Sequence, residues 1–287
     1  MDYFLHILIV IGIYLILVAS LNLVWGYAGL LSFAHAAFAG IGAYGTALVL
    51  MRLGVNFFAS LLLACVLAAL LGALLAAATV RLGGDYFILA VLGFQIVVTA
   101  VLLNWVELTR GPFGLHGIPK PTLLGHRLSA TWEYLVLVAA VAAMVVGIIH
   151  RTVSLPFGRI LRAIREDEVA VLVLGKDVAR AKVIVFAVSS GCAGLAGGLY
   201  AHYYTYVDPF LFDIHEAILL ATMVVVGGNS LRGSLVGVVV LLLFPEALRA
   251  LNVPGEVTVH VRQILYGALL FFFMLVRPQG LIGEHRA

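Results

Sequence analysis

The chain has 287 residues, of which 63% are hydrophobic and only 11% are charged, and its mean hydropathy is +1.14. This composition excludes an ordinary soluble domain and indicates a polytopic membrane protein. The net charge of +3 is weak evidence for a nucleic-acid partner. Because strict alternation of polar and apolar residues is absent, the spans are expected to be helices. The predicted fold class is therefore all-α, a polytopic integral membrane helical bundle.

The first uncharged run extends from Tyr3 to Met51, and no Lys or Arg precedes it. Without a basic n-region, its beginning is expected to be the first span rather than a cleaved signal peptide. As one helix at about 1.5 Å per residue, the run would be more than twice as long as the hydrocarbon core, about 30 Å, is thick. We therefore predict a break at Gly26 and Gly29, which tolerate turn geometry. A second helix should run from about Ser32, its cap, to Met51.

The rest of the chain holds further apolar segments separated by mostly short connections. Residues 107–131 contain three of the eight prolines and are predicted to form an ordered outside loop rather than a helix. The total is about eight or nine apolar segments in a single transmembrane domain, residues 1–287, with one or two of them discontinuous or re-entrant. The later spans are expected at 57–79, 86–106, 132–150, about 178–203, the two short runs of 216–248, and about 262–276.

The positions of the basic residues predict the orientation of the chain. Seven of the 17 Lys and Arg residues fall in the connection 151–182, which the positive-inside rule places in the cytoplasm. Counting crossings outward from this connection leaves the amino terminus outside. The same count places four more basic residues inside, namely Arg81, Arg232, Arg277 and Arg286.

The connection 151–182 is predicted to be helical, with Ser154 as its cap, Pro156 in its first turn and Gly175 at its end. Asp177 is expected to cap the span that follows. An apolar strip accompanies the charges of this segment. An ordinary basic loop explains the charge but neither the strip nor the acidic residues, whereas a docking surface for a cytoplasmic partner explains both. Opposite charges at helical spacing are expected to pair, Arg162 with Glu166 and Arg165 with Glu168.

The sequence VGGNSLRGS, residues 226–234, divides the apolar segment 216–248 much as the first break divides the first run. Interrupted hydrophobic segments in corresponding parts of a chain indicate a transport pathway built from discontinuous helices. Residue matches between the two pieces are few, so an internal repeat and a chance likeness both stay open. The candidate hinge residues at this interruption are Gly227, Gly228, Asn229 and Ser230.

Motifs of enzymes, metal sites and nucleotide sites are absent from the sequence. There is no GxxxxGK[ST], HExxH or CxxC, so no catalytic residue, metal or other cofactor is expected. Nearly all acidic residues are at span ends or in loops, which argues against transport driven by an ion gradient. Two rival functions are a secondary carrier, which would take up substrate alone under such a gradient, and a membrane-embedded enzyme, which would need a nucleophile or an acid–base pair facing a cavity.

His35 is the one ionisable residue well inside a predicted span. The favoured interpretation is a histidine satisfied by a backbone carbonyl at a helix contact, and the alternative is a residue that lines a substrate path. Metal binding is the least favoured, because no second ligand has a matching spacing. Whether Ser32 and His35 contact substrate or only shape the break stays open. Gln95, Asn104, Ser189 and Ser190 are expected to form hydrogen bonds between helices rather than to contact substrate.

Six sequence blocks follow one another along nearly the whole chain: GYAGLLSFAHAAFAGIGAY (26–44), LGGDYFILAVLGF (82–94), LTRGPFGLHGIP (108–119), PFGRILRAIREDEVAVLVLGKDVARAKVIVFAVSSGCAGLAGGLYAHY (156–203), GGNSLRGS (227–234) and RPQGL (277–281). In this order and spacing they resemble the LivM-type permease subunit of the branched-chain amino acid ABC transporter family. The third and sixth blocks favour the LivM type over the sister LivH type. The chain departs from the family pattern at Ala34, Lys176, Asp177 and Asn229. Asn229 replaces a Gly, and because Asn tolerates left-handed geometry, the hinge is expected to survive.

The resemblance implies a heteromeric importer in the bacterial or archaeal cytoplasmic (inner) membrane. It would contain a LivH-type second permease subunit, two cytoplasmic ATP-binding subunits and an extracytoplasmic substrate-binding protein. This chain would be a transport subunit and not an enzyme, because ATP hydrolysis belongs to a separate subunit. The substrate would be a branched-chain or related amino acid, with urea, amides or other small polar solutes as the alternative. The residues implied in ATPase coupling are Gly158, Arg159, Arg162, Ala163, Arg165, Glu166, Asp167, Glu168, Leu174 and Gly175.

Overall fold

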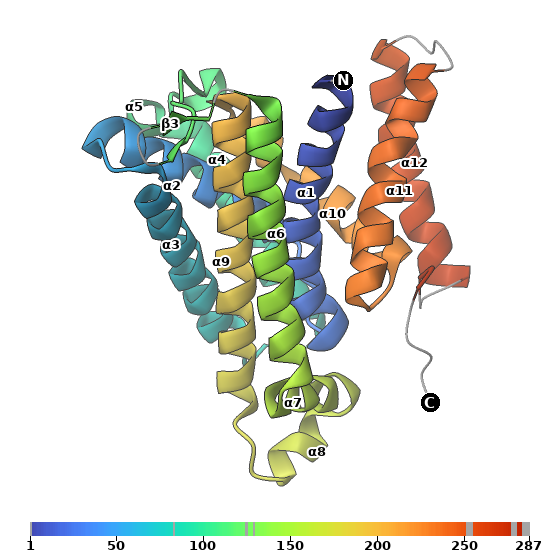
Figure 1. The fold of residues 1–287 in the computed structure, drawn as a ribbon. Coiled ribbons are helices and arrows are strands. Elements are labelled where there is room, and N and C mark those ends of the chain that lie inside the picture. The colour runs from blue at the N-terminus through green and yellow to red at the C-terminus, as the bar shows by residue number, and fades with distance from the viewer. Residues whose placement is uncertain are drawn as a thin grey trace.

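The computed structural model describes residues 2–82, 84–123, 126–128, 130–250, 255–276 and 280–282. Within these residues, seven helices are long and apolar enough to cross a membrane, judged by length and composition. Figure 1 shows long helices standing side by side, with the amino terminus at one end and the short helices α7 (Pro156–Glu166) and α8 (Glu168–Val173) at the other. The predicted all-α helical bundle is confirmed.

The first apolar run is broken, as predicted, but the break is longer than expected. α1 (Asp2–Asn22) continues into a π-helical turn, η1 (Leu23–Tyr27), and α2 (His35–Leu53) begins later than predicted. Ser32 is therefore not the cap of the second helix. The N-cap residue is Ala34, which has no side-chain cap, and Ser32 Oγ only accepts a long hydrogen bond, 3.4 Å, from the Ala34 amide.

The next two spans, α3 (Phe57–Thr79) and α4 (Gly84–Asn104), agree with their predicted ranges. The outside loop after them was predicted to lack helix, and this is wrong in part. Its prolines and glycines end each element after a few residues, yet short pieces of regular structure form between them. They are α5 (Val106–Thr109), η2 (Gly111–Phe113), β1 (Leu115–His116), β2 (Thr122–Leu123) and β3 (His126–Arg127); β1 pairs with β4 (Tyr206–Val207), and β2 pairs with β3.

α9 (Val178–Tyr204) lies at the centre of the bundle, and α6 (Thr131–Ser154) lies beside it. In its most apolar stretch, 67% of α9 is buried, against 22% of α4. Small residues allow this close packing. A Cβ at Gly194 would lie only 2.7 Å from Ala68 Cβ on α3, and one at Gly198 would lie 2.5 Å from Leu61 of the same helix.

The connection after α6 forms two helices where one was predicted. Pro156 occupies the first turn of α7, as expected, but Ser154 is the last residue of α6 and is not a cap. Asp167 separates α7 from α8 because its carboxylate caps α8, accepting from two amides of the first turn at 2.9 and 3.0 Å. Gly175 follows α8 with a φ of +73°. Asp177 caps α9 at 2.9 Å, as predicted.

The last third of the chain contains η3 (Pro209–Phe212), α10 (Ile214–Gly227), α11 (Leu231–Ala250) and α12 (Gly255–Val276). α10 has 14 residues, or about 21 Å at 1.5 Å per residue, which is too short to cross a membrane by itself. Only together with η3, as Pro209–Gly227, is it one of the seven candidate spans. In Figure 1 it lies behind α1, within the bundle. α12 begins earlier than predicted. Arg277 and Arg286, which the charge count placed inside, are outside the described residues.

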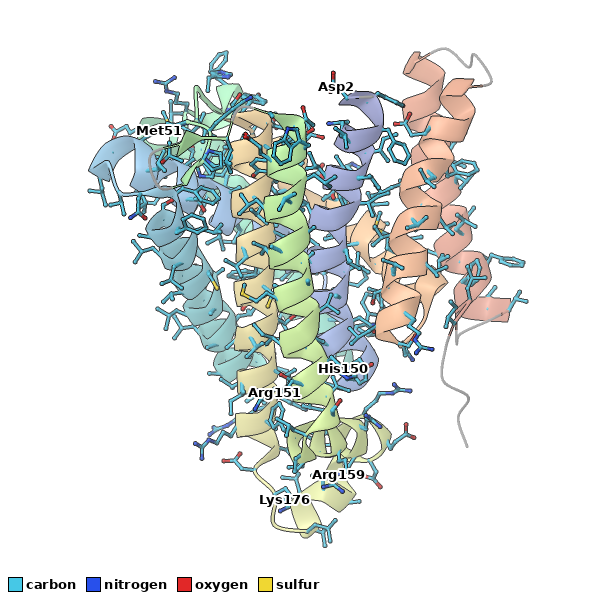
Figure 2. The ribbon with its side chains drawn as sticks, in the orientation of Figure 1. Asp2, Met51, His150, Arg151, Arg159 and Lys176 are labelled. Atoms are coloured by element: carbon cyan, nitrogen blue, oxygen red, sulfur yellow. The ribbon has the colours of Figure 1, made fainter. Side chains whose placement is uncertain are left out.

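Charged side chains gather at the end of the bundle that holds α7 and α8. Figure 2 shows Arg151, Arg159 and Lys176 at this end, whereas Asp2 and Met51 lie at the opposite end. The basic connection and the amino terminus are thus separated by the length of the bundle. This is the arrangement expected of a chain that crosses a membrane with its basic connection on one side.

Candidate functional site

The two glycines of the first break are required for different reasons. Gly29 has a φ of +71°, a left-handed geometry that favours glycine. Gly26 has no positive φ, but a Cβ there would overlap the side-chain oxygen of Asn22. The backbone of the break keeps a hydrogen bond of its own, 3.2 Å from the Gly29 amide to the Trp25 carbonyl. The break is therefore an ordered structure.

The second break lies between α10 and α11. Gly228 has a φ of +98°, whereas Asn229 has no positive φ. The conformation that favours glycine is therefore at Gly228, and the Asn at position 229 is not required to adopt it. Ser230 Oγ accepts a hydrogen bond of 2.9 Å from the Gly233 amide and so satisfies a donor at the start of α11. A Cβ at Gly227 would overlap the backbone of Gly233. The two helices cross at their glycines.

Asn22, which was not among the predicted site residues, brings the two breaks together. Its side chain is buried, and Nδ2 donates to the Ser230 carbonyl at 2.9 Å and to Ser234 Oγ at 2.8 Å. A longer contact of 3.4 Å reaches the Gly228 carbonyl. Two interruptions about 200 residues apart therefore share one amide. A single Asn within an apolar span was the available signal, because such groups need partners in a membrane.

His35 and Ser32 are both buried, each with 1% of its surface exposed. His35 Nε2 lies 2.8 Å from Ser189 Oγ, and the Ser189 hydroxyl donates to the Ser20 carbonyl. The predicted partner of His35, a backbone carbonyl, is wrong: the ring meets a hydroxyl on α9. The predicted interhelical role of Ser189 is confirmed. Neither Ser32 nor His35 lines the cavities described below.

Arg165 connects α7 directly with the first break. Its Nη1 donates to the Gly26 carbonyl, one of the acceptors that the end of a helix leaves without an intrahelical partner. Its stem packs so closely that a Cβ at Gly29 would lie 2.8 Å from Arg165 Cγ. A cavity of about 400 Å³ adjoins this contact, bounded by residues 28–31, the start of α4 and the helices α7 and α8.

The charge pairs predicted along one helical face do not form. Asp167 ends α7, so the residues after it leave the face that carries the arginines. Gly158 is buried at the corner of α6 and α7, where a Cβ would overlap the Val153 backbone. The observed contacts are Arg165 with Glu166 at 3.9 Å, Glu168 with Lys182 at 2.7 Å, and Arg162 with the Tyr27 ring, 5.9 Å from its centroid. The exposed members of the predicted coupling set are Arg159, Arg162, Ala163, Glu166, Asp167, Glu168, Leu174 and Gly175.

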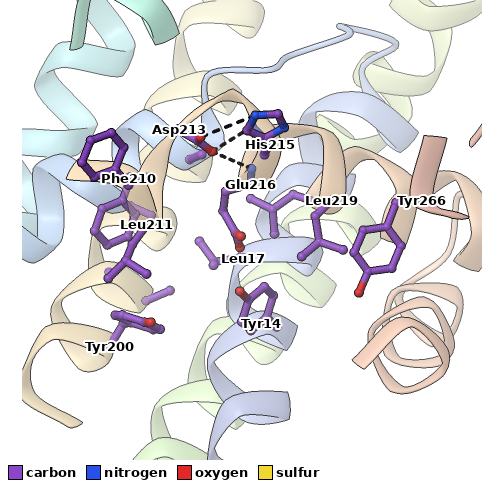
Figure 3. A pocket seen from close by; sticks show the side chains of 16 residues that line it. Tyr14, Leu17, Tyr200, Phe210, Leu211, Asp213, His215, Glu216, Leu219 and Tyr266 are labelled. Atoms are coloured by element: carbon purple, nitrogen blue, oxygen red, sulfur yellow. Dashed lines mark hydrogen bonds and ion pairs between the residues drawn. The ribbon is translucent and has the colours of Figure 1, made fainter. Parts of the chain in front are cut away.

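A cavity of about 270 Å³ lies among α1, α2, α9, η3 and α10. Figure 3 shows Asp213 and Glu216, from the start of α10, beside it. The acidic residues were expected at span ends, and Glu216 is near a helix end. However, α10 begins inside the bundle, so its first turn meets a cavity rather than the membrane surface. The polar residues of the lining are Tyr14, Tyr200, Asp213, His215, Glu216 and Tyr266.

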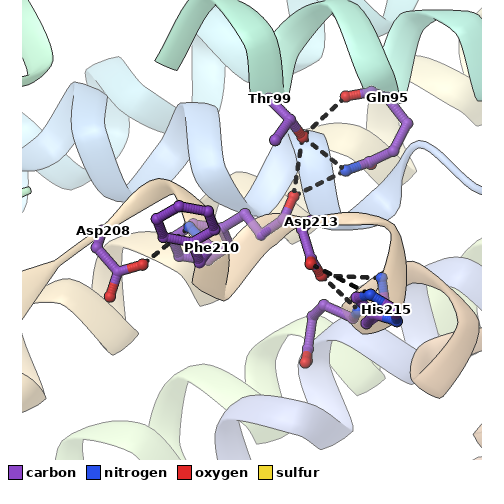
Figure 4. Close-up of polar contacts among 8 residues, drawn as sticks. Gln95, Thr99, Asp208, Phe210, Asp213 and His215 are labelled. Carbon is purple, nitrogen blue, oxygen red and sulfur yellow. Dashed lines mark hydrogen bonds and ion pairs between the residues drawn. The ribbon is translucent and has the colours of Figure 1, made fainter. Parts of the chain in front are cut away.

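Gln95 holds together two helix starts that border this cavity (Figure 4). It is fully buried. Its Oε1 accepts from the Ala37 amide in the first turn of α2 at 2.7 Å, and its Nε2 donates to the Phe212 carbonyl just before α10, also at 2.7 Å. Thr99 adds a contact of 3.4 Å to the same carbonyl. The predicted interhelical hydrogen bonding of Gln95 is confirmed. The same prediction is wrong for Asn104 and Ser190, because each donates within its own helix, to the carbonyls of Ala100 and Phe186, both at 2.8 Å.

Membrane-length helices, two interrupted helices that touch, and a cavity at the start of a half-length helix are features of a polytopic membrane permease. A family model described as "Branched-chain amino acid transport system / permease component" matches residues 3–274. The chain belongs to this family.

Relatives with established names agree with this assignment. The chain is 35% identical to the high-affinity branched-chain amino acid transport system permease protein LivM of Escherichia coli K12, over 94% of this chain and 68% of the relative. It is 27% identical to a probable LivM of Methanocaldococcus jannaschii, over 97% and 92% of the two chains. It is 26% identical to the LivH permease of Escherichia coli K12, over 94% and 91%. No solved structure matches the chain.

Proposed function

We propose that the chain is one transmembrane permease subunit of an ABC importer that moves branched-chain or related amino acids inward by alternating access. Family membership and the names of its LivM relatives support this proposal. Its partners would be a second, LivH-type permease, two cytoplasmic ATP-binding subunits and an extracytoplasmic binding protein, at the inner membrane of a bacterium or archaeon. The ATP-binding subunits would hydrolyse ATP, and this chain would only respond to them.

The observation that carries the proposal is the contact of Arg165 with the first break. A partner that moves α7 would move Arg165, and with it the carbonyl of Gly26. The break is joined through Asn22 to the second break. One displacement at α7 therefore reaches both interrupted helices through hydrogen-bonded contacts. Chains of packed side chains and hydrogen bonds of this kind carry energetic coupling between distant sites.

α8 presents an apolar surface that fits a docking partner. Four large aliphatic side chains gather in and just after this short helix, next to a strongly charged segment. Exposed apolar patches of this kind mark interaction sites. An ATP-binding subunit with an apolar groove would cover them. The residues and their exposed fractions are Val169 at 68%, Leu172 at 52%, Val173 at 82% and Leu174 at 76%.

The test is leucine uptake by cells that lack their own branched-chain amino acid importers and express this chain together with the proposed second permease, ATP-binding and binding-protein subunits. Val173→Asp should abolish uptake while the chain stays in the membrane, because a carboxylate cannot enter an apolar groove without a partner. Val173→Leu, which keeps the surface apolar, serves as the matched control and should retain uptake. Uptake that persists when the ATP-binding genes are deleted would refute the proposal and favour a secondary carrier.

A further inference from the structure

Glu216 stands at the junction of two cavities. It lines the central cavity of about 270 Å³ and also a neighbouring cavity of about 250 Å³ that extends to His6 and Glu246. Tyr14 lines both cavities as well. In Figure 3 the Glu216 side chain points from α10 toward Tyr14 and Leu17. Tyr200, Leu219 and Tyr266 are also shared, so the two cavities adjoin at the Glu216 side chain.

The side chains around this junction favour a cation. The described lining of the two cavities includes three carboxylates, those of Asp213, Glu216 and Glu246, and neither Lys nor Arg. Asp213 is already engaged, because its Oδ1 accepts from the amides of His215 and Glu216 at 2.8 and 3.2 Å. The His215 ring lies 4.0 Å from the Asp213 carboxylate and is 63% exposed, so it lies at the outer edge of the cavity, next to Asp213. Of the three carboxylates, Glu216 is the one that lines both cavities.

Glu216 is held in position but keeps capacity for a ligand. The Tyr14 hydroxyl forms a hydrogen bond with its carboxylate. An ionised carboxylate offers about four acceptor positions, so it can accept from several donors at once. Removing a carboxylate from water is costly unless a cation and hydrogen-bond donors compensate for the lost hydration. An ammonium group supplies a positive charge and three donors. The ring of Tyr200, in the same lining, adds a surface that attracts cations.

The rest of the central cavity suits a small aliphatic side chain. Leu17, Leu219 and Leu220 line it, with no more than 8% of any of them exposed. Its volume of about 270 Å³ is slightly below the range of about 300–1,000 Å³ typical of pockets for drug-sized ligands. A polar anchor on one side of a small apolar space distinguishes an amino acid from a larger or wholly polar solute.

We propose that Glu216 binds the α-ammonium group of a small aliphatic amino acid as it passes through the chain, while Leu17, Leu219 and Leu220 contact the side chain. The amino-acid class rests on the proposed function. The site itself rests on the two cavities and on their charge. Glu216 thereby recognises substrate inside the permease, at a stage after any external binding protein has released it.

Thermal unfolding of the purified full chain in detergent tests this site, because a ligand that binds only the folded state raises its unfolding temperature. Leucine is compared with 3-methylbutylamine, which keeps the ammonium group but lacks the carboxylate, and with 4-methylpentanoate, which lacks the ammonium group. We expect stabilisation by the first two and none by the third. Glu216→Gln should raise the half-saturating concentration about 30-fold or more, since breaking a buried charge pair removes at least that affinity. Glu107→Gln, on the exposed outer loop, should leave it unchanged.

Equal stabilisation by leucine and 4-methylpentanoate, no stabilisation by any of the three compounds, or equal affinity in wild type and Glu216→Gln would each overturn the inference. The ligand comparison in the wild-type chain stands even if the Gln variant fails to fold, and Glu216→Asp, which keeps the charge, should retain binding. The two proposals fail separately. Leucine uptake with unaltered binding in Glu216→Gln would refute this site and leave the importer intact. Stabilisation by 3-methylbutylamine without ATP-dependent leucine uptake would support the site and refute the importer.

Discussion

The two broken helices differ in what holds them. The first break has a long irregular segment, 28–34, and meets α7 through Arg165, which donates to the Gly26 carbonyl, and through Arg162, which lies over the Tyr27 ring. The second break, 228–230, is short and fastened on both sides. Asn22 bonds to one side of it. On the other side the segment 280–282 pairs with the end of α10, with hydrogen bonds of 2.8 and 3.1 Å from its amides.

This difference suggests that the two breaks have different mechanical roles. A segment with fewer hydrogen bonds to distant parts of the chain opens at lower free energy than one that is bonded on both sides. The first break also adjoins the cavity of about 400 Å³ beside α7, so it has room to change shape. We therefore expect the first break to move with α7 and the second to act as the fixed support. The following substitutions test this comparison.

Gly227→Ala should have the largest effect, because it attacks the fixed support. Its Cβ would overlap the Gly233 backbone, and backbone cannot move aside as a flexible side chain can. We expect a loss of about 3 kcal/mol in the free energy of unfolding, measured by thermal denaturation in detergent, and no uptake. Gly267→Ala is the matched control, since a Cβ there meets nothing within 4 Å. Similar losses in both variants would show that α10 and α11 are not tightly joined.

Asn22→Ala should have the next largest effect, because it cuts the link between the breaks. The Ser230 carbonyl and the Ser234 hydroxyl would lose a buried partner, which costs about 1–3 kcal/mol. Unfolding in detergent measures the loss. Asn104→Ala is the control: Asn104 is exposed and bonds only to its own helix, so its removal should change stability by no more than about 0.5 kcal/mol. A loss in the control as large as in Asn22→Ala would mean that no special link exists.

Arg165→Ala should act mainly on coupling. It removes a charged hydrogen bond worth about 1.5–3 kcal/mol, so we expect substrate-stimulated ATP hydrolysis by the reconstituted complex to fall about tenfold or more. Arg162 and Glu166 belong to the predicted coupling set as well. Both are exposed, and exposed charges contribute about 0–1 kcal/mol, so Arg162→Ala and Glu166→Ala should lower the stimulation less. The reverse order would assign the coupling route to the outer face of α7.

Ser32→Ala should have the smallest effect. The Ser32 hydroxyl accepts only a hydrogen bond of 3.4 Å from the next turn of chain, so we expect stability to change by no more than about 0.5 kcal/mol. The KM for leucine uptake should stay the same. A clear increase in KM with unchanged stability would show that Ser32 touches substrate, and would make the first break part of the binding path rather than only a moving joint.

Much of the fold could be predicted because length and hydropathy are properties of the sequence alone. A run that is too long must break, and Gly26 and Gly29 are where it breaks. Boundaries were less certain, because they depend on tertiary contacts: α2 begins at His35, whose ring meets Ser189 of α9. The charge pairing within 151–182 failed for a similar reason. Asp167 caps α8 and interrupts the helix on which the spacing depended.

The candidate site was harder to predict than the fold. The role of Asn22 could not be predicted, because its partner Ser230 is brought next to α1 only by the tertiary fold. Glu216 was dismissed as a span-end acid, because the sequence does not reveal that α10 starts inside the bundle. Both cases show that an ionisable or amide side chain in an apolar chain must be judged by its depth in the bundle. That depth follows from the packing of distant helices.

The hydrogen bonds of Gln95 have a consequence for how the pathway opens. One amide group clamps the first turn of α2 to the chain just before α10, so these two helix starts cannot separate without breaking both bonds. Together these two helix starts form one rigid unit at the border of the central cavity. α9 and α1 join the same end of α2 through a separate chain of contacts, from His35 Nε2 to Ser189 Oγ at 2.8 Å and from the Ser189 hydroxyl to the Ser20 carbonyl. Any opening of the pathway that keeps both bonds of Gln95 would therefore move the starts of α2 and α10 together as one unit.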